Sequence, residues 1–158
     1  MKTNSADHAT FVIERDLRAP VGRAFAAWAD PRAKQQWFAC HDNWVSLEYG
    51  LDFRVGGAEV NRVADAEGIV HAYDARYLDI VPDARIIYAY DMKLGDNRIS
   101  ASLTTVTFRP TPQGTTMTFT EQVVFLDGYT DDGSRRQGTE ILIDNVQAFI
   151  ERESEMVH

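Results

Sequence analysis

The sequence predicts an α+β domain in which helices cover one face of an antiparallel sheet. Residues 10–18 alternate between apolar and polar side chains, as in a strand, and two short helical segments follow them. Strand-like segments separated by short turns then extend to residue 126, and a long amphipathic segment follows. Strands joined by short turns pair antiparallel, and helices kept apart from them in sequence cover one face of the sheet.

Proline residues mark the first boundaries between elements. The predicted strand over residues 10–18 ends before Pro20, a residue that suits the first turn of a helix. A helix is predicted over residues 21–29. It ends before Pro31, because the residue preceding a proline avoids the α region. A second short helix is predicted over residues 32–38.

The central part of the chain predicts six further strands, which brings the total to about seven. Their boundaries are turn residues, such as Gly56-Gly57 and Gly95-Asp96-Asn97. The predicted strands cover residues 44–55, 59–64, 69–81, 86–94, 99–109 and 115–126.

The final predicted element is a helix over residues 137–155, with Ser134 as a capping residue. Ile143, Val146 and Ile150 recur at helical spacing, with charged and polar residues on the opposite side. This pattern gives one broad apolar stripe that would face a sheet.

Length and charge narrow the class of protein. A chain of 158 residues fits one domain, and we expect a flexible tail over residues 1–9 and a single domain over 10–158. The formal net charge of −8 argues against nucleic-acid and anionic membrane partners. Cys40 is the single cysteine, and the N-terminal residues lack a signal-peptide pattern, so we expect a cytoplasmic protein. Homodimer formation is left open.

Strand alternation predicts which side chains face the concave side of the sheet. The predicted inward set is Ile86, Tyr88, Tyr90, Met92, Thr104, Val106, Phe108, Met117, Phe119, Glu121, Val123 and Phe125. Tyr88, Tyr90 and Glu121 are polar groups on an otherwise apolar face. Three interpretations of these groups are open. They could orient a ligand in an apolar pocket, or they could form an internal network in which Glu121 pairs with an arginine such as Arg76. Glu121 could also act in acid–base catalysis.

Several motifs in order resemble the SRPBCC (START-like, polyketide-cyclase-like) superfamily, in the branch related to activator of heat-shock protein 90 ATPase. They are Trp28-Ala29-Asp30-Pro31, Trp37-Phe38, Phe53-Arg54-Val55-Gly56-Gly57, residues 77–82, residues 106–108 with 116–120, and Gly138. The resemblance implies a helix-grip fold, in which a curved sheet wraps around the long helix and leaves a cavity between them.

The sequence departs from that family at two positions. Phe38 and Thr139 stand where the family often has tryptophan, and a missing indole at Thr139 implies a larger or a collapsed cavity. The candidate ligand-binding residues are Trp37, Phe38, Tyr88, Tyr90, Phe108, Met117, Phe119, Glu121, Thr139 and Leu142.

No catalytic or metal motif is evident in the sequence. Three adjacent residues, Cys40-His41-Asp42, cannot easily form a triad, because triad members come from separate segments. The four histidines and one cysteine show no metal-ligand spacing, and no phosphate-binding loop is present, so no cofactor is expected.

We therefore expect a binding protein for a small hydrophobic or amphipathic molecule held between the sheet and the last helix. Two alternatives stay open. One is a cyclase- or hydrolase-type enzyme that uses Glu121 with a tyrosine. The other is a cofactor that contacts a chaperone ATPase, as the family resemblance implies.

Overall fold

The computed structural model describes residues 3–38 and 43–156, with side chains up to residue 152. Its elements follow the predicted order of one strand, two helices, six strands and one helix. They are β1 (Ala6–Leu17), α1 (Val21–Ala29), α2 (Pro31–Phe38), β2 (Val45–Leu51), β3 (Ala58–Ala64), β4 (Val70–Val81), β5 (Arg85–Leu94), β6 (Asn97–Thr111), β7 (Gly114–Leu126) and α3 (Ser134–Met156). Within the described ranges, no helix combines the length and apolar character needed to cross a membrane.

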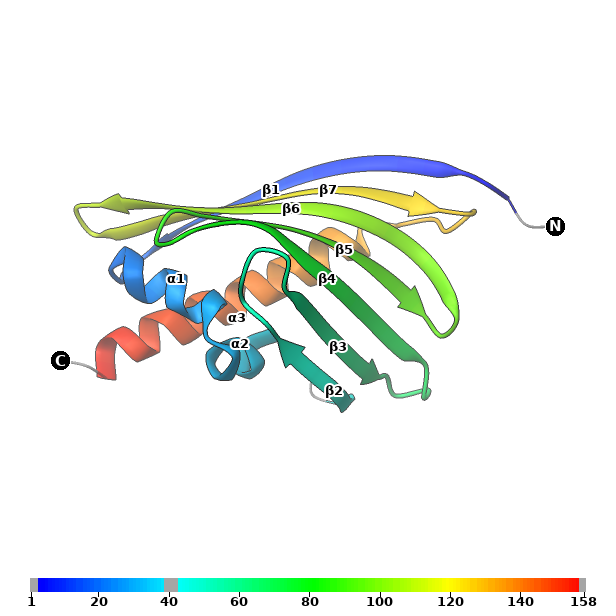
Figure 1. Ribbon diagram of the computed structural model, residues 1–158, viewed down its shortest axis with the longest axis horizontal. Coiled ribbons are helices and arrows are strands. Elements are labelled where there is room, and N and C mark those ends of the chain that lie inside the picture. The colour runs from blue at the N-terminus through cyan, green and yellow to red at the C-terminus, as the bar shows by residue number, and fades with distance from the viewer. Residues whose placement is uncertain (1–2, 39–42, 157–158) are drawn as a thin grey trace.

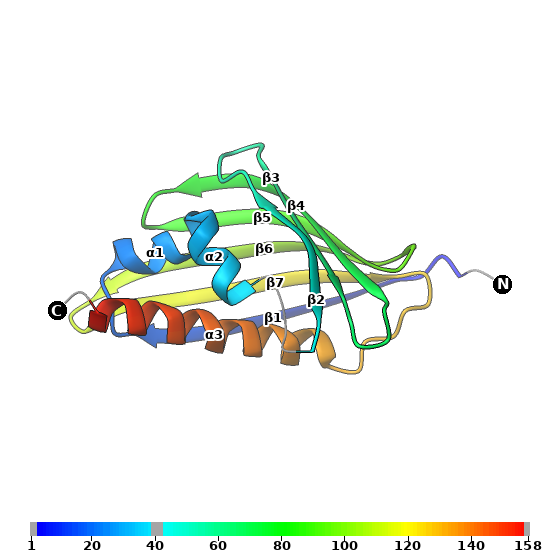
Figure 2. The ribbon, with the colours of Figure 1, turned by 90° about the horizontal axis from the view of Figure 1, so that it is seen from below.

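The seven strands form one antiparallel sheet in the order β1-β7-β6-β5-β4-β3-β2. The sheet is strongly curved, and all three helices lie on its concave side, with α3 running beneath the strands (Figures 1 and 2). The predicted apolar stripe of α3 is buried there, since Ile143, Val146 and Ile150 are at most 1% exposed. The helix-grip fold predicted from the sequence is confirmed.

The first strand extends beyond its predicted start. β1 begins at Ala6, so residues 6–9, which we expected in a flexible tail, belong to the sheet. Their partners are residues 123–126 of β7. This pairing is long-range, and residues 6–9 alone carry too little apolar alternation to indicate it.

The second strand ends earlier than predicted. β2 stops at Leu51, and the chain turns through residues 52–57, where the Asp52 N–H donates to the Ala58 carbonyl at 2.9 Å. Gly57 approaches this turn so closely that a Cβ atom would lie 2.0 Å from the Asp52 carbonyl oxygen. Any larger residue would therefore force the turn apart.

The last helix begins three residues before the predicted start, at Ser134. Carboxylates before the helix, rather than the Ser134 side chain, accept its first backbone N–H groups. Asp132 accepts from the Ser134 N–H at 3.2 Å, and Asp131 accepts from the Arg135 N–H at 3.1 Å. Negative charge at a helix N-terminus is favourable, because it satisfies these N–H groups and complements the helix dipole.

The inward face of β5, β6 and β7 follows the predicted alternation. All predicted members are buried except Tyr90 and Met92, which are half-buried. The register places Glu121 beside Thr104, and Thr104 beside Tyr88, in one row across the sheet. Polar side chains from three strands are thus aligned under α3.

Candidate functional site

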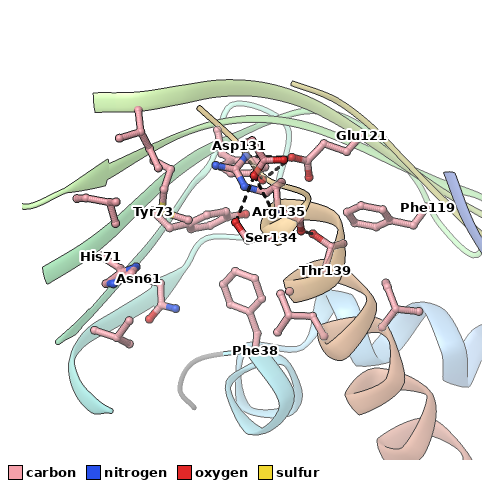
Figure 3. A pocket seen from close by; sticks show the side chains of 18 of the residues that line it. Phe38, Asn61, His71, Tyr73, Phe119, Glu121, Asp131, Ser134, Arg135 and Thr139 are labelled. Carbon is pink, nitrogen blue, oxygen red and sulfur yellow. Dashed lines mark hydrogen bonds and ion pairs between the residues drawn. The ribbon is translucent and has the colours of Figure 1, made fainter. Parts of the chain in front are cut away.

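A cavity of about 370 Å³ lies between the concave face of the sheet and the N-terminal half of α3 (Figure 3). Aromatic side chains form much of its wall. They come from both short helices and from the sheet, and include Trp28, Trp37, Phe38, Tyr73, Tyr88 and Phe119. The rings pack against one another; Trp28 and Trp37, for example, have centroids 4.8 Å apart. The site is therefore a mainly apolar pocket of a size suited to a small molecule.

One end of the cavity is polar and is centred on Glu121, which is 1% exposed. Its Oε2 atom accepts hydrogen bonds from the Tyr90 hydroxyl at 2.8 Å and the Ser102 hydroxyl at 3.1 Å. Arg135 Nη1, from the first turn of α3, lies 3.2 Å from the same oxygen. A buried carboxylate is tolerated because these donors and this cation compensate its lost hydration.

Arg135 also connects the sheet to the helix. Its Nη2 donates to the Ser100 hydroxyl at 2.7 Å, and its Nη1 lies 3.3 Å from the Tyr90 hydroxyl. Burial raises the pKa of Tyr90, and the adjacent Glu121 carboxylate raises it further, so Tyr90 stays a neutral hydrogen-bond donor. The result is a network of one cation, one anion and neutral hydroxyls at the cavity wall.

Eight of the ten predicted ligand-binding residues line this cavity; they are Trp37, Phe38, Tyr88, Tyr90, Phe119, Glu121, Thr139 and Leu142. The other two, Phe108 and Met117, pair with each other across β6 and β7 and are buried outside it. Phe25 of α1 packs edge-on against Phe108 with a centroid separation of 5.6 Å. That end of the concave face is filled by α1, which strand alternation alone could not show.

Four further residues line the cavity that the sequence patterns did not indicate: Arg135, Tyr73, Asn61 and His71. Arg135 was not predicted to line the cavity, because the last helix was predicted to begin only at residue 137. One signal was available: Arg135 precedes Thr139 by four residues and so shares its helix face. The internal partner we considered for Glu121, Arg76, was wrong; Arg76 donates instead to the Gly56 carbonyl at 2.9 Å.

A second polar cluster lies behind the aromatic wall. Lys34 of α2 and Glu59 of β3 are both fully buried, and their Nζ and Oε1 atoms are 2.7 Å apart. Hydroxyl groups of three tyrosines donate to the same carboxylate: Tyr77 at 2.9 Å, Tyr73 at 3.2 Å and Tyr49 at 2.8 Å. Burial lowers the pKa of Lys34, against the opposing effect of Glu59. This ion pair fastens α2, which carries Trp37 and Phe38, to the sheet.

The Cys40-His41-Asp42 segment, considered above as a triad, lies outside the residues that the structure describes. Among the side chains that the structure describes, in residues 3–38 and 43–152, no three of His, Cys, Asp or Glu are grouped closely enough to hold a metal ion.

Comparison with solved structures gives two close relatives, both from rhizobia. An uncharacterized protein from Rhizobium leguminosarum is 67% identical, with a TM-score of 0.92 over 95% of this chain and 99% of that one. A protein from Rhizobium loti is 41% identical, with a TM-score of 0.85 over 92% of this chain and 99% of the other. An AHSA1-like protein from Aeromonas hydrophila, 18% identical with a TM-score of 0.67 over 92% of this chain and 94% of the other, shares the fold. No curated protein matches the chain.

A protein-family model also matches the sequence of this chain. It covers residues 18–151, which include both short helices, strands β2 to β7 and most of α3. The matched region therefore contains the whole cavity wall described above. The chain belongs to the Activator of Hsp90 ATPase homolog 1-like family, a branch of the SRPBCC superfamily.

Proposed function

We propose that the protein binds a small amphipathic molecule in the cavity beneath α3. The apolar body of the ligand would pack against the aromatic wall, and its polar group would lie at Glu121 and Arg135. The observation that carries this proposal is a carboxylate, 1% exposed, at the end of a cavity of about 370 Å³ whose other walls are mainly apolar. Family membership is consistent with a ligand-binding domain.

Binding is favoured over catalysis by the state of the polar groups. An acid–base role for Glu121 with a tyrosine would need a proton that moves between enzyme and substrate. The Tyr90 hydroxyl already donates to Glu121 Oε2, and Arg135 holds the same oxygen. Tyr90 and Arg135 thus hold the Glu121 carboxylate in one position, where it can fix the orientation of a ligand.

Filling the cavity should abolish binding. Thr139 is 7% exposed and lines the cavity, so tryptophan in its place would occupy the space that a ligand needs. We expect the neutral fluorescent dye N-phenyl-1-naphthylamine to bind the native protein with enhanced emission, and Thr139→Trp to weaken that binding at least about tenfold, which corresponds to about 1.4 kcal/mol.

Thr139→Val is the matched control, because valine keeps the size of threonine and should retain dye binding. Circular dichroism would verify that both variants are folded. A native protein that leaves the dye emission unchanged, or a folded Thr139→Trp variant that binds it normally, would contradict the proposal.

A further inference from the structure

The Glu121 carboxylate uses one of its two oxygens for contacts within the described chain. Tyr90, Ser102 and Arg135 all reach Oε2, and no hydrogen bond from another described residue reaches Oε1. In Figure 3 the dashed lines that reach Glu121 end on one of its two carboxylate oxygens, and Glu121 lies at the cavity wall. A carboxylate has about four acceptor positions. Oε1 is therefore an acceptor at the cavity wall that is available to a ligand.

Arg135, which supplies the positive charge at this end of the cavity, is already paired with Glu121. Arg135 lies 3.2 Å from Glu121, and its Nη atoms are also directed at Tyr90 and two serine hydroxyls. Asp131 is a second carboxylate in the lining, and it accepts backbone hydrogen bonds at the start of α3. The acidic and basic side chains at this end thus comprise two carboxylates and one guanidinium, and a ligand carboxylate would meet a net negative charge.

The apolar wall continues directly from this acceptor. Phe119 precedes Glu121 by two residues on β7 and faces the same side of the sheet, and Phe38 lies on the opposite side of the cavity (Figure 3). A compact apolar ring system that packs against Phe119 would extend toward Glu121, which is two residues further along the same strand. A polar substituent on the edge of that ring would face Oε1.

We infer that the ligand is an apolar molecule whose polar group is a hydrogen-bond donor without negative charge: a hydroxyl, an amide N–H or an amine. Glu121 Oε1 accepts that bond, and Glu121 discriminates against carboxylates by repulsion and by the cost of burying a second anion. This inference rests on the proposed function and specifies the chemical class of ligand for the same cavity.

A matched series of three naphthalenes tests the inference by displacement of the bound dye. 2-Naphthol carries a donor, 2-methoxynaphthalene has the same ring but no donor, and 2-naphthoate carries a negative charge. We expect 2-naphthol to bind at least about tenfold more tightly than either of the others, because a hydrogen bond to a charged group is stronger than one between neutral groups.

Glu121→Gln then assigns the discrimination to this residue. The amide keeps the shape but loses the charge, so the preference for 2-naphthol over 2-naphthoate should fall at least about fivefold, in keeping with the weaker bond to a neutral group. Glu14→Gln is the control, since it removes one negative charge from an exposed position on β1. It should leave all three affinities unchanged.

The outcomes separate the two proposals. If the dye and all three naphthalenes fail to bind, both the proposed function and this inference are overturned. If the naphthalenes bind but 2-naphthoate is as tight as 2-naphthol, the inference alone fails. It also fails if a folded Glu121→Gln variant keeps the full native preference, because Glu121 would then not set it. The order of affinities in the native protein tests the ligand class even if that variant does not fold.

Discussion

Replacing Lys34 with methionine should lower the free energy of unfolding by about 3–5 kcal/mol, which is the usual cost of removing one partner of a buried ion pair. Methionine fills similar space, so the loss comes mainly from charge. Without Lys34, the carboxylate of Glu59 stays fully buried with no cation beside it, and only tyrosine hydroxyls hydrogen-bond to it. Chemical denaturation monitored by circular dichroism would measure the change.

Two further variants distinguish this mechanism from general damage. Lys34→Met combined with Glu59→Gln removes the orphan charge while keeping an acceptor for the tyrosines, so the double variant should be more stable than Lys34→Met alone. Lys93→Met removes the same charge from an exposed position on β5 and should change stability by less than about 0.5 kcal/mol. A Lys34→Met variant within about 1 kcal/mol of the native protein would refute the role assigned to the pair.

The buried tyrosines should make the protein unfold steeply in alkali. Burial raises the pKa of Tyr73, Tyr77 and Tyr88 above the ordinary value of 10, and the neighbouring Glu59 carboxylate raises the first two further. The folded state therefore retains protons that the unfolded state loses above about pH 10. The free energy of unfolding should fall by about 1.4 kcal/mol per pH unit for each, or roughly 4 kcal/mol per unit for the three.

Lys34 acts with the opposite sign but cannot cancel this effect. Burial lowers its pKa, so its contribution to stability rises with pH only up to the unfolded value of about 10.5 and is constant above it. We expect the ultraviolet absorbance of phenolate and the loss of circular dichroism to change together in one cooperative step. Tyr88→Phe should reduce the slope by about 1.4 kcal/mol per pH unit, which is the share of one tyrosine. Gradual ionisation of these tyrosines in a protein that stays folded would show that they are not held as described.

Much of the fold and the cavity follows from local patterns. The alternation along β5 to β7 identified the inward face because side chains in a strand alternate regardless of context. The same logic predicted that Tyr88, Tyr90 and Glu121 would face the cavity. It could not show that α1 fills the end of the concave face near Phe108, because the position of a helix over a sheet is a tertiary property.

The two polar clusters were harder to predict. Charged residues are normally assigned to the surface. In β3, however, the side chains that face the core are those of Glu59, Asn61 and Val63. The partner of Glu59, Lys34, comes from a helix 25 positions earlier, and no spacing rule connects the two. The contact between Glu121 and Arg135 depended on where α3 begins, and helix ends are the least certain part of a prediction from sequence.

The pairing of β1 with β7 has a consequence for synthesis of the chain. Ile13 lies opposite Phe119, so the first strand emerges from the ribosome about 100 residues ahead of the strand that completes it. At translation rates of roughly 5–20 residues per second, this delay is roughly 5–20 s. During that time β1 has no β7 to pair with, and the sheet is completed only after β7 has been synthesised. A transcript truncated before β7 would yield a chain with an unprotected, aggregation-prone N-terminal strand.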